Sequence, residues 1–137
     1  MAPRAAPPAD LTVRVPPGYR LPVDEACHAI ATDPASLQMA AGGPLYPDHV
    51  VFLGDKPTLI DPAGFAASRP PPWLLARGAG VLVHRSLPAG GEEMVRCLAR
   101  FLPRIDPAAR LIYLSERQVG ELLDWDAEKY RRQLADA

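Results

Sequence analysis

The chain has 137 residues, a formal net charge of −1 and a hydrophobic fraction of 48%, which is the size and composition of one ordinary globular domain. A nearly neutral chain has no general attraction for nucleic acid or for an anionic membrane surface, and no segment approaches the roughly 18 consecutive apolar residues of a membrane span. The first ten residues lack the apolar stretch of a secretory signal. These features argue against nucleic-acid and membrane partners and favour a cytoplasmic protein.

Proline is unusually frequent, with 17 residues. Because proline lacks a backbone donor and fixes φ, this content predicts short elements joined by extended connectors. We expect residues 1–10 to form a disordered leader and residues 11–137 to form a single domain. Residues 11–22 alternate apolar and polar side chains, which predicts an extended segment interrupted by the sequence PPG.

Helices are predicted in three segments of the first hundred residues. Residues 23–33 begin with Asp24 as a cap, and the helix after Asp33 has that residue at its N-cap and a proline at its first position. Residues 90–102 give the clearest helical pattern, with apolar residues on one face and two glutamates near the positive end of the helix dipole. We expect His28, in the first helix, to lie on the surface.

Strands are predicted between these helices. Residues 49–54 predict a short buried strand and residues 57–61 a second one across a turn. Residues 71–85 contain two apolar runs separated by Gly78 and Gly80, and residues 105–114 are expected to turn and return as a strand. This alternation predicts an α/β fold, with a small mixed sheet of about four short strands and flanking helices in one domain.

The last segment is predicted to be an exposed helix. Ser115 caps it and Gln118 stands three residues later, which is the spacing of a reciprocal capping box. Trp125, in the middle of this helix, has a large apolar body and one polar N–H, so it either anchors the helix or contacts a partner subunit.

The chemistry-bearing pair that stands out is Asp48-His49. A histidine titrates near physiological pH, so the pair could carry a proton or ligate a metal, which makes both residues catalytic candidates. The alternative is structural: Tyr46-Pro47 forms a turn and Asp48 caps backbone donors. The sequence leaves both interpretations open.

A second candidate site follows an apolar run. His84 and Arg85 stand at the predicted end of a strand, ahead of Gly90 and Gly91 at the predicted start of a helix, which is an arrangement that can hold an anion such as a phosphate. Polar residues at a strand end also simply mark the return to solvent. The sequence GAG between the two runs lacks the third glycine of a dinucleotide fingerprint and the Gly-Lys of a P-loop.

A metal site requires at least three converging side chains. The sequence contains no HxH, HExxH or paired-cysteine spacing, so no local metal motif is present. The one alternative is that His49, His84 and an acidic residue such as Asp48 converge on an ion in the monomer or across a dimer. Cys27 and Cys97 lie far apart, and each is expected to be a buried free thiol.

Three stretches together resemble a known family. They are "LYPDHVVFLGDKPTLI", then "LLARGAGVLV" followed by a helix, then "YLSERQVGELLDWDAEKY". Their order and spacing are similar to the C-terminal region of class II aldolase/adducin-family proteins, especially those of the rhamnulose-phosphate aldolase type. The resemblance covers about residues 42–130.

The resemblance implies retro-aldol cleavage or epimerisation of sugar phosphates. In the family a divalent metal, usually zinc, is held by three histidines and polarises a carbonyl, while a glutamate moves the proton. Those residues belong to the family's N-terminal aldolase domain, and this chain lacks the HxH pair and the glycine-rich phosphate loop. No catalytic residue therefore carries over. What does carry over is architectural, namely Asp48-His49, Gly78, Gly80, Ser115 and Trp125.

The leading hypothesis is an accessory or C-terminal domain of a class II aldolase-like protein, which acts with an aldolase domain or a homo-oligomer partner and is not catalytic alone. The first alternative is a small zinc-dependent lyase that uses His49 and His84. The second is a module that binds an anion, such as a sugar phosphate, through His84, Arg85, Gly90 and Gly91.

Overall fold

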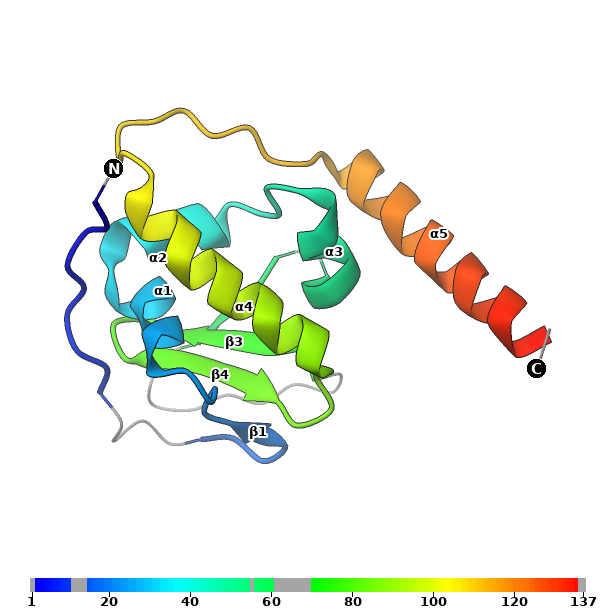
Figure 1. Ribbon diagram of the computed structural model, residues 1–137, viewed down its shortest axis with the longest axis horizontal. Coiled ribbons are helices and arrows are strands. Elements are labelled where there is room, and N and C mark those ends of the chain that lie inside the picture. Colours follow the sequence, from blue (N-terminus) through cyan, green and yellow to red (C-terminus); the bar gives the residue numbers. More distant parts are fainter. Residues whose placement is uncertain (1, 11–14, 55, 61–69, 136–137) are drawn as a thin grey trace.

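The computed structural model describes residues 2–10, 15–54, 56–60 and 70–135, except for the side chains of residues 126–135. Within these residues the elements are, in chain order, β1 (Tyr19–Arg20), the 3₁₀ helix η1 (Glu25–His28), α1 (Ala29–Thr32), α2 (Pro34–Ala41), α3 (Pro47–Leu53), β2 (Thr58–Ile60), β3 (Trp73–Ala76), β4 (Gly80–His84), α4 (Ala89–Phe101), the 3₁₀ helix η2 (Leu102–Arg104) and α5 (Glu116–Ala135). The α/β prediction is confirmed (Figure 1).

The sheet is mixed and has four strands in the order β1-β4-β3-β2. Strands β3 and β4 form an antiparallel hairpin in which Ala76 pairs with Gly80, β1 adds antiparallel to β4, and β2 adds parallel to β3. The hairpin turn contains Gly78 at φ +69°, a conformation that glycine adopts without steric cost. The amide of Gly78 donates to the carbonyl of Ala31 at 3.0 Å, so the turn is fastened to α1.

The two strands of the hairpin are buried on both faces. Side chains alternate along β3, so that Trp73 and Leu75 belong to the main core while Leu74 and Ala76 belong to a smaller cluster on the opposite face. Strand β4 alternates in the same way. Burial on both faces explains why these segments are continuous apolar runs.

The helices cover one face of the sheet. Helices α1 and α4 lie across β3 and β4 (Figure 1). Val95 and Leu98 of α4, and Leu102 of η2, are buried in the main core. The predicted caps of the early helices are present: the Asp24 carboxylate accepts from the amide of Ala26 at 2.9 Å, and the Asp33 carboxylate accepts from that of Ser36 at 3.3 Å.

Two predicted strands are wrong. Residues 49–54 were expected to be a strand, but Pro47–Leu53 form α3, with Pro47 in the first helical turn and Val50 and Leu53 buried one turn apart. A short apolar run does not distinguish a strand from a buried helix, and Pro47 at the start favours the helix. Residues 105–114, all described, contain no strand.

The connector after η2 instead packs as an extended segment. The Tyr113 hydroxyl donates to the carbonyl of Met39 at 3.0 Å, and the amide of Leu114 donates to the carbonyl of Pro44 at 2.9 Å. The Tyr113 ring lies so close to Gly42 that a Cβ there would be 2.4 Å from it. These contacts hold the connector against α2 as an extended segment that is not part of the sheet.

Part of the predicted leader has defined contacts. Residues 2–10 have no regular secondary structure, but the Arg4 guanidinium forms a salt bridge with Asp33 at 3.1 Å and donates to the carbonyls of Leu102 and Ile105. At the other end of this segment, the amide of Asp10 donates to the carbonyl of Ala79 at 2.9 Å. The segment is thus fastened to the domain at both ends, whereas the sequence predicted disorder.

Helix α5 begins with the predicted capping box. The Gln118 side chain accepts from the amide of Ser115 at 2.9 Å, and the Ser115 hydroxyl accepts from the amide of Gln118 at 3.2 Å. The helix starts beside α3 and then extends away from the rest of the chain (Figure 1). The prediction of an exposed final helix therefore agrees with the structure over its described part.

The close contact between Gly80 and His28 gives a test of the packing. A Cβ at Gly80 would lie 2.7 Å from the ring nitrogen of His28, and this ring is buried and cannot swing away. We expect Gly80→Ala to lower the free energy of unfolding by about 1–3 kcal/mol, the usual cost of overpacking, in urea denaturation. Gly120→Ala, where the added Cβ meets open space, is the control. It should leave stability unchanged or raise it by up to about 1 kcal/mol, and equal losses in both variants would contradict the packing argument.

Candidate functional site

Asp48 and His49 do not form a site together. They are adjacent on α3, so their side chains point in different directions: Asp48 is exposed, whereas His49 is 1% exposed. The His49 ring packs edge-on against Tyr46 and Trp73, with ring centroids 6.1 and 6.2 Å apart. The His49 ring is thus part of the aromatic packing between α3 and β3.

His84 and Arg85 stand at the end of β4, as predicted. The His84 ring packs edge-on against Tyr19 at 5.0 Å, and its Nδ1 lies 2.6 Å from the Ser86 hydroxyl and accepts from the Ser86 amide at 3.1 Å. The backbone amide of Arg85 donates to the carbonyl of Gly18 at 2.8 Å. These contacts hold the turn between β4 and α4 in place.

Gly90 and Gly91 lie in the first turn of α4 and are explained by packing. A Cβ at Gly90 would lie 2.8 Å from the Phe52 ring, and one at Gly91 would lie 2.4 Å from Leu87. The amide of Gly91 already donates to the carbonyl of Pro88 at 2.9 Å. Glu92 occupies the same turn, and its carboxylate is bound by Arg20 and by the amide of Val23.

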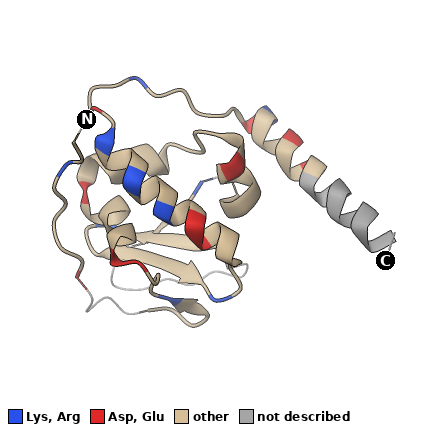
Figure 2. Ribbon diagram, viewed as in Figure 1, with Lys and Arg blue, Asp and Glu red and all other residues tan. Residues whose placement is uncertain are grey.

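An ion-pair cluster joins the start of α4 to the residues before η1. Arg20 and Glu92 are 2.6 Å apart, and Arg96 bridges Asp24 at 3.1 Å and Glu93 at 2.8 Å. The hydrogen bond from Arg20 lowers the pKa of Glu92, and the amide of Ala26, followed by Arg96, lowers the pKa of Asp24. Figure 2 shows the order along α4, with acidic residues at its start and arginines toward its end, which is the favourable orientation for a helix dipole.

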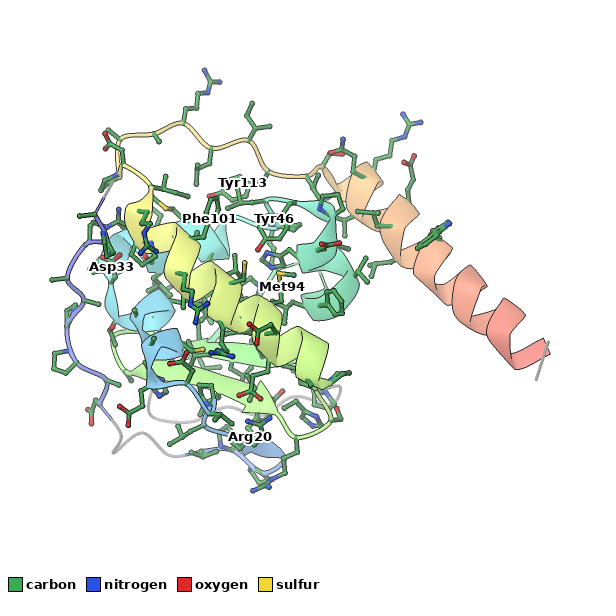
Figure 3. The ribbon with its side chains drawn as sticks, in the orientation of Figure 1. Arg20, Asp33, Tyr46, Met94, Phe101 and Tyr113 are labelled. Atoms are coloured by element: carbon green, nitrogen blue, oxygen red, sulfur yellow. The ribbon has the colours of Figure 1, made fainter. Side chains whose placement is uncertain are left out.

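A cluster of aromatic and sulfur side chains fills the space between α3 and α4. The Tyr46 hydroxyl donates to the sulfur of Met94 at 3.1 Å, and the Tyr46 and Phe101 rings meet edge-on at 6.4 Å (Figure 3). Burial raises the pKa of Tyr46 above its ordinary value. Tyr46 is therefore a packing residue here, while Phe101, at 45% exposed, also reaches the surface.

The other residues predicted to be structural are Gly78, Gly80, Ser115 and Trp125. Gly78 forms the hairpin turn, Gly80 accommodates the His28 ring and Ser115 caps α5. Trp125 is 59% exposed, so its ring is more available to a partner than an anchor buried in the core would be.

The cysteines differ from each other. Cys27 is buried, as predicted, and burial raises the pKa of its thiol to about 12, so it is unreactive at neutral pH. Cys97 was also expected to be buried, but it is exposed, because α4 is amphipathic and its residue 97 faces away from the sheet.

Metal binding finds no support in the described part of the chain. Within that part, no three histidine, cysteine, aspartate or glutamate side chains lie close enough to hold an ion. Neither His49 nor His84 therefore belongs to a group of three potential metal ligands among these residues. The same residues include no helix long and apolar enough to cross a membrane.

His28 was expected to lie on the surface, but it is buried. It is 5% exposed, and its Nδ1 accepts a hydrogen bond from the backbone amide of Val81 at 3.0 Å. Burial lowers its pKa below the ordinary value of 6.5, and the nearby charge of Glu25 only partly opposes this. A neutral ring whose Nδ1 accepts must carry its proton on Nε2. No spacing around His28 distinguishes it from a surface residue, because its partner is 53 positions away.

The chain matches no protein-family model, no curated protein and no solved structure in the comparisons made with each. The family resemblance inferred from the sequence therefore stays a prediction.

The environment of His28 predicts a pH dependence of stability. Because the folded state resists protonation of His28, the unfolded state binds more protons once the pH falls below 6.5. We expect the free energy of unfolding to decrease as the pH falls from 6.5 to the lowered pKa, and then to stop responding to this residue.

The measurement is urea denaturation across this pH range for the wild type and for His28→Asn, whose Oδ1 occupies the position of the histidine Nδ1 and can still accept from the Val81 amide. In the variant, the free energy of unfolding should no longer decrease with falling pH over the range in which His28 titrates. An imidazole titration followed by NMR that places the His28 pKa at or above its ordinary value would contradict the prediction.

Proposed function

We propose that this chain is an accessory C-terminal domain of a class II aldolase-like protein and that it acts by assembling with an aldolase domain. The observation that carries the proposal is α5, a 20-residue helix that extends away from the domain and presents exposed apolar side chains. A helix of this kind is costly to leave in water and is typical of an element that docks on a partner.

The histidines support a non-catalytic role for the chain alone. His28 accepts from a backbone amide, His84 bonds to Ser86, and His49 packs between two aromatic rings. Each of the three therefore has a structural task, and among the described residues none has two further potential metal ligands beside it.

The surface proposed for docking surrounds the start of α5 and includes Phe52 of α3, with Leu123 and Trp125 on different sides of the helix. Their exposed fractions are 42, 43 and 59%, and α3, which contains Phe52, contacts α5. Large exposed aromatic side chains are frequent energetic hot spots of interfaces. The occupant that we propose is an aldolase domain, because the three resembling stretches follow such a domain in the family.

The two alternatives have less in their favour. A lyase that uses His49 and His84 needs a third ligand, and none is present among the described residues. A phosphate module at Gly90 and Gly91 would place the anion beside the carboxylate of Glu92. No specific observation favours either alternative.

Assembly is testable by substitution on α5. We expect Trp125→Ala to weaken binding to a class II aldolase protein from the same organism by about 30-fold or more, the size of a typical tryptophan hot spot, in isothermal titration calorimetry. The melting temperature of the free chain should not change, because Trp125 is exposed. Glu121→Gln, a polar change on the same helix, should leave the affinity unchanged.

A chain that stays monomeric with every such protein, or that binds equally well with and without Trp125, would contradict the proposal. A self-associated chain whose dimer depends on Trp125 would identify a second copy as the occupant instead.

The second test is activity. We expect the purified chain to show no turnover of ketose 1-phosphates in a coupled dehydrogenase assay with added Zn²⁺, because His49 and His84 lack a described third ligand. Turnover that follows the chain through successive purification steps and is lost in His49→Gln would support the lyase alternative over our proposal.

A further inference from the structure

A cavity of about 550 Å³ lies between the leader segment and the first helices. Residues 6–9 form one wall, residues 21–23 a second, and the helical residues Glu25, His28 and Thr32, with two alanines, a third. None of these residues belongs to the surface proposed for docking. The volume is in the range of sites for small ligands.

His28 supplies a hydrogen-bond donor to this cavity. Its Nδ1 faces the sheet, where it accepts from the Val81 amide and lies against Gly80. The proton of the neutral ring is therefore on Nε2, which points away from the sheet. Because burial keeps the ring neutral near physiological pH, the donor carries no net charge.

Thr32 also lines the cavity. Its hydroxyl oxygen is covered by the surrounding atoms and has no hydrogen-bond partner among the described residues, so a ligand in the cavity does not reach it. Thr32 follows His28 by four positions, which places both on one face of the continuous helical segment formed by η1 and α1.

The rest of the lining determines the charge of the ligand. It is formed by proline, alanine, leucine and valine side chains, and its one charged side chain among the described residues is Glu25. No described lysine or arginine lines the cavity, so nothing compensates the cost of removing an anion from water. A phosphate or carboxylate is therefore a poor fit.

We propose that this cavity binds a small, uncharged, mainly apolar molecule that carries an acceptor oxygen such as a ketone carbonyl, with His28 Nε2 as its polar partner. The leader segment closes the site from one side, since Arg4 and Asp10 fasten it at its two ends. The proposal does not depend on the function proposed above, because it involves a different part of the molecule.

The test is a titration of the isotope-labelled full chain with acetophenone and cyclohexanone, followed through the methyl signals of Ala26, Ala29 and Thr32. We expect saturable shifts confined to the cavity, together with a shift of the His28 Nε2–H signal. Benzoate, which has the ring of acetophenone but a negative charge, should bind at least fivefold more weakly.

Two variants and a control separate binding from folding. His28→Asn keeps an acceptor for the Val81 amide, because an asparagine Oδ1 occupies the position of the histidine Nδ1, but it removes the Nε2 donor and should weaken ketone binding about fivefold. Ala26→Leu should fill the cavity and abolish the shifts, while Ala108→Leu, at an exposed position distant in sequence, should leave them unchanged.

The proposal is overturned if neither ketone gives saturable shifts in the cavity. It is also overturned if benzoate binds as tightly as acetophenone, or if Ala26→Leu leaves the titration unaltered.

Discussion

The rest of the structure depends on the hairpin of β3 and β4, whose residues from Trp73 to Ala76 and from Gly80 to Val83 are buried. Helices α1 and α4 pack on one face, β1 and β2 add to its two edges, and the turn at Gly78 is bonded to α1. The bond from the Val81 amide to His28 links the same strand to η1. The cavity beside His28 takes its position from this hairpin.

In this arrangement, side chains of types that often serve catalysis make contacts that stabilise the fold. His28 satisfies a backbone amide, His49 fills an aromatic contact beside Trp73, and His84 stabilises a turn. The ion pairs of Arg20 and Arg96 likewise join segments distant in sequence. The three histidines and these two arginines therefore all have contacts that stabilise the fold.

The two proposed surfaces differ in their chemistry. The surface of Phe52, Leu123 and Trp125 is exposed and apolar, and is suited to a protein partner. The cavity beside His28 is bordered on one side by the leader segment and offers one uncharged polar group, the His28 Nε2, and is suited to a small molecule. A ligand there would contact α1 and the leader, while a partner on α5 would contact the opposite end of the chain.

The sequence by itself determined the features that depend on near neighbours. The caps at Asp24 and Asp33, the box of Ser115 and Gln118, and the glycine turn between β3 and β4 were all predictable, because each is fixed by residues two to four positions apart. Tertiary structure decided the rest. Whether residues 49–54 are a helix or a strand, whether His28 is buried, and whether residues 6–9 and Thr32 enclose a cavity depend on contacts between segments 20 to 100 positions apart, which local patterns do not encode.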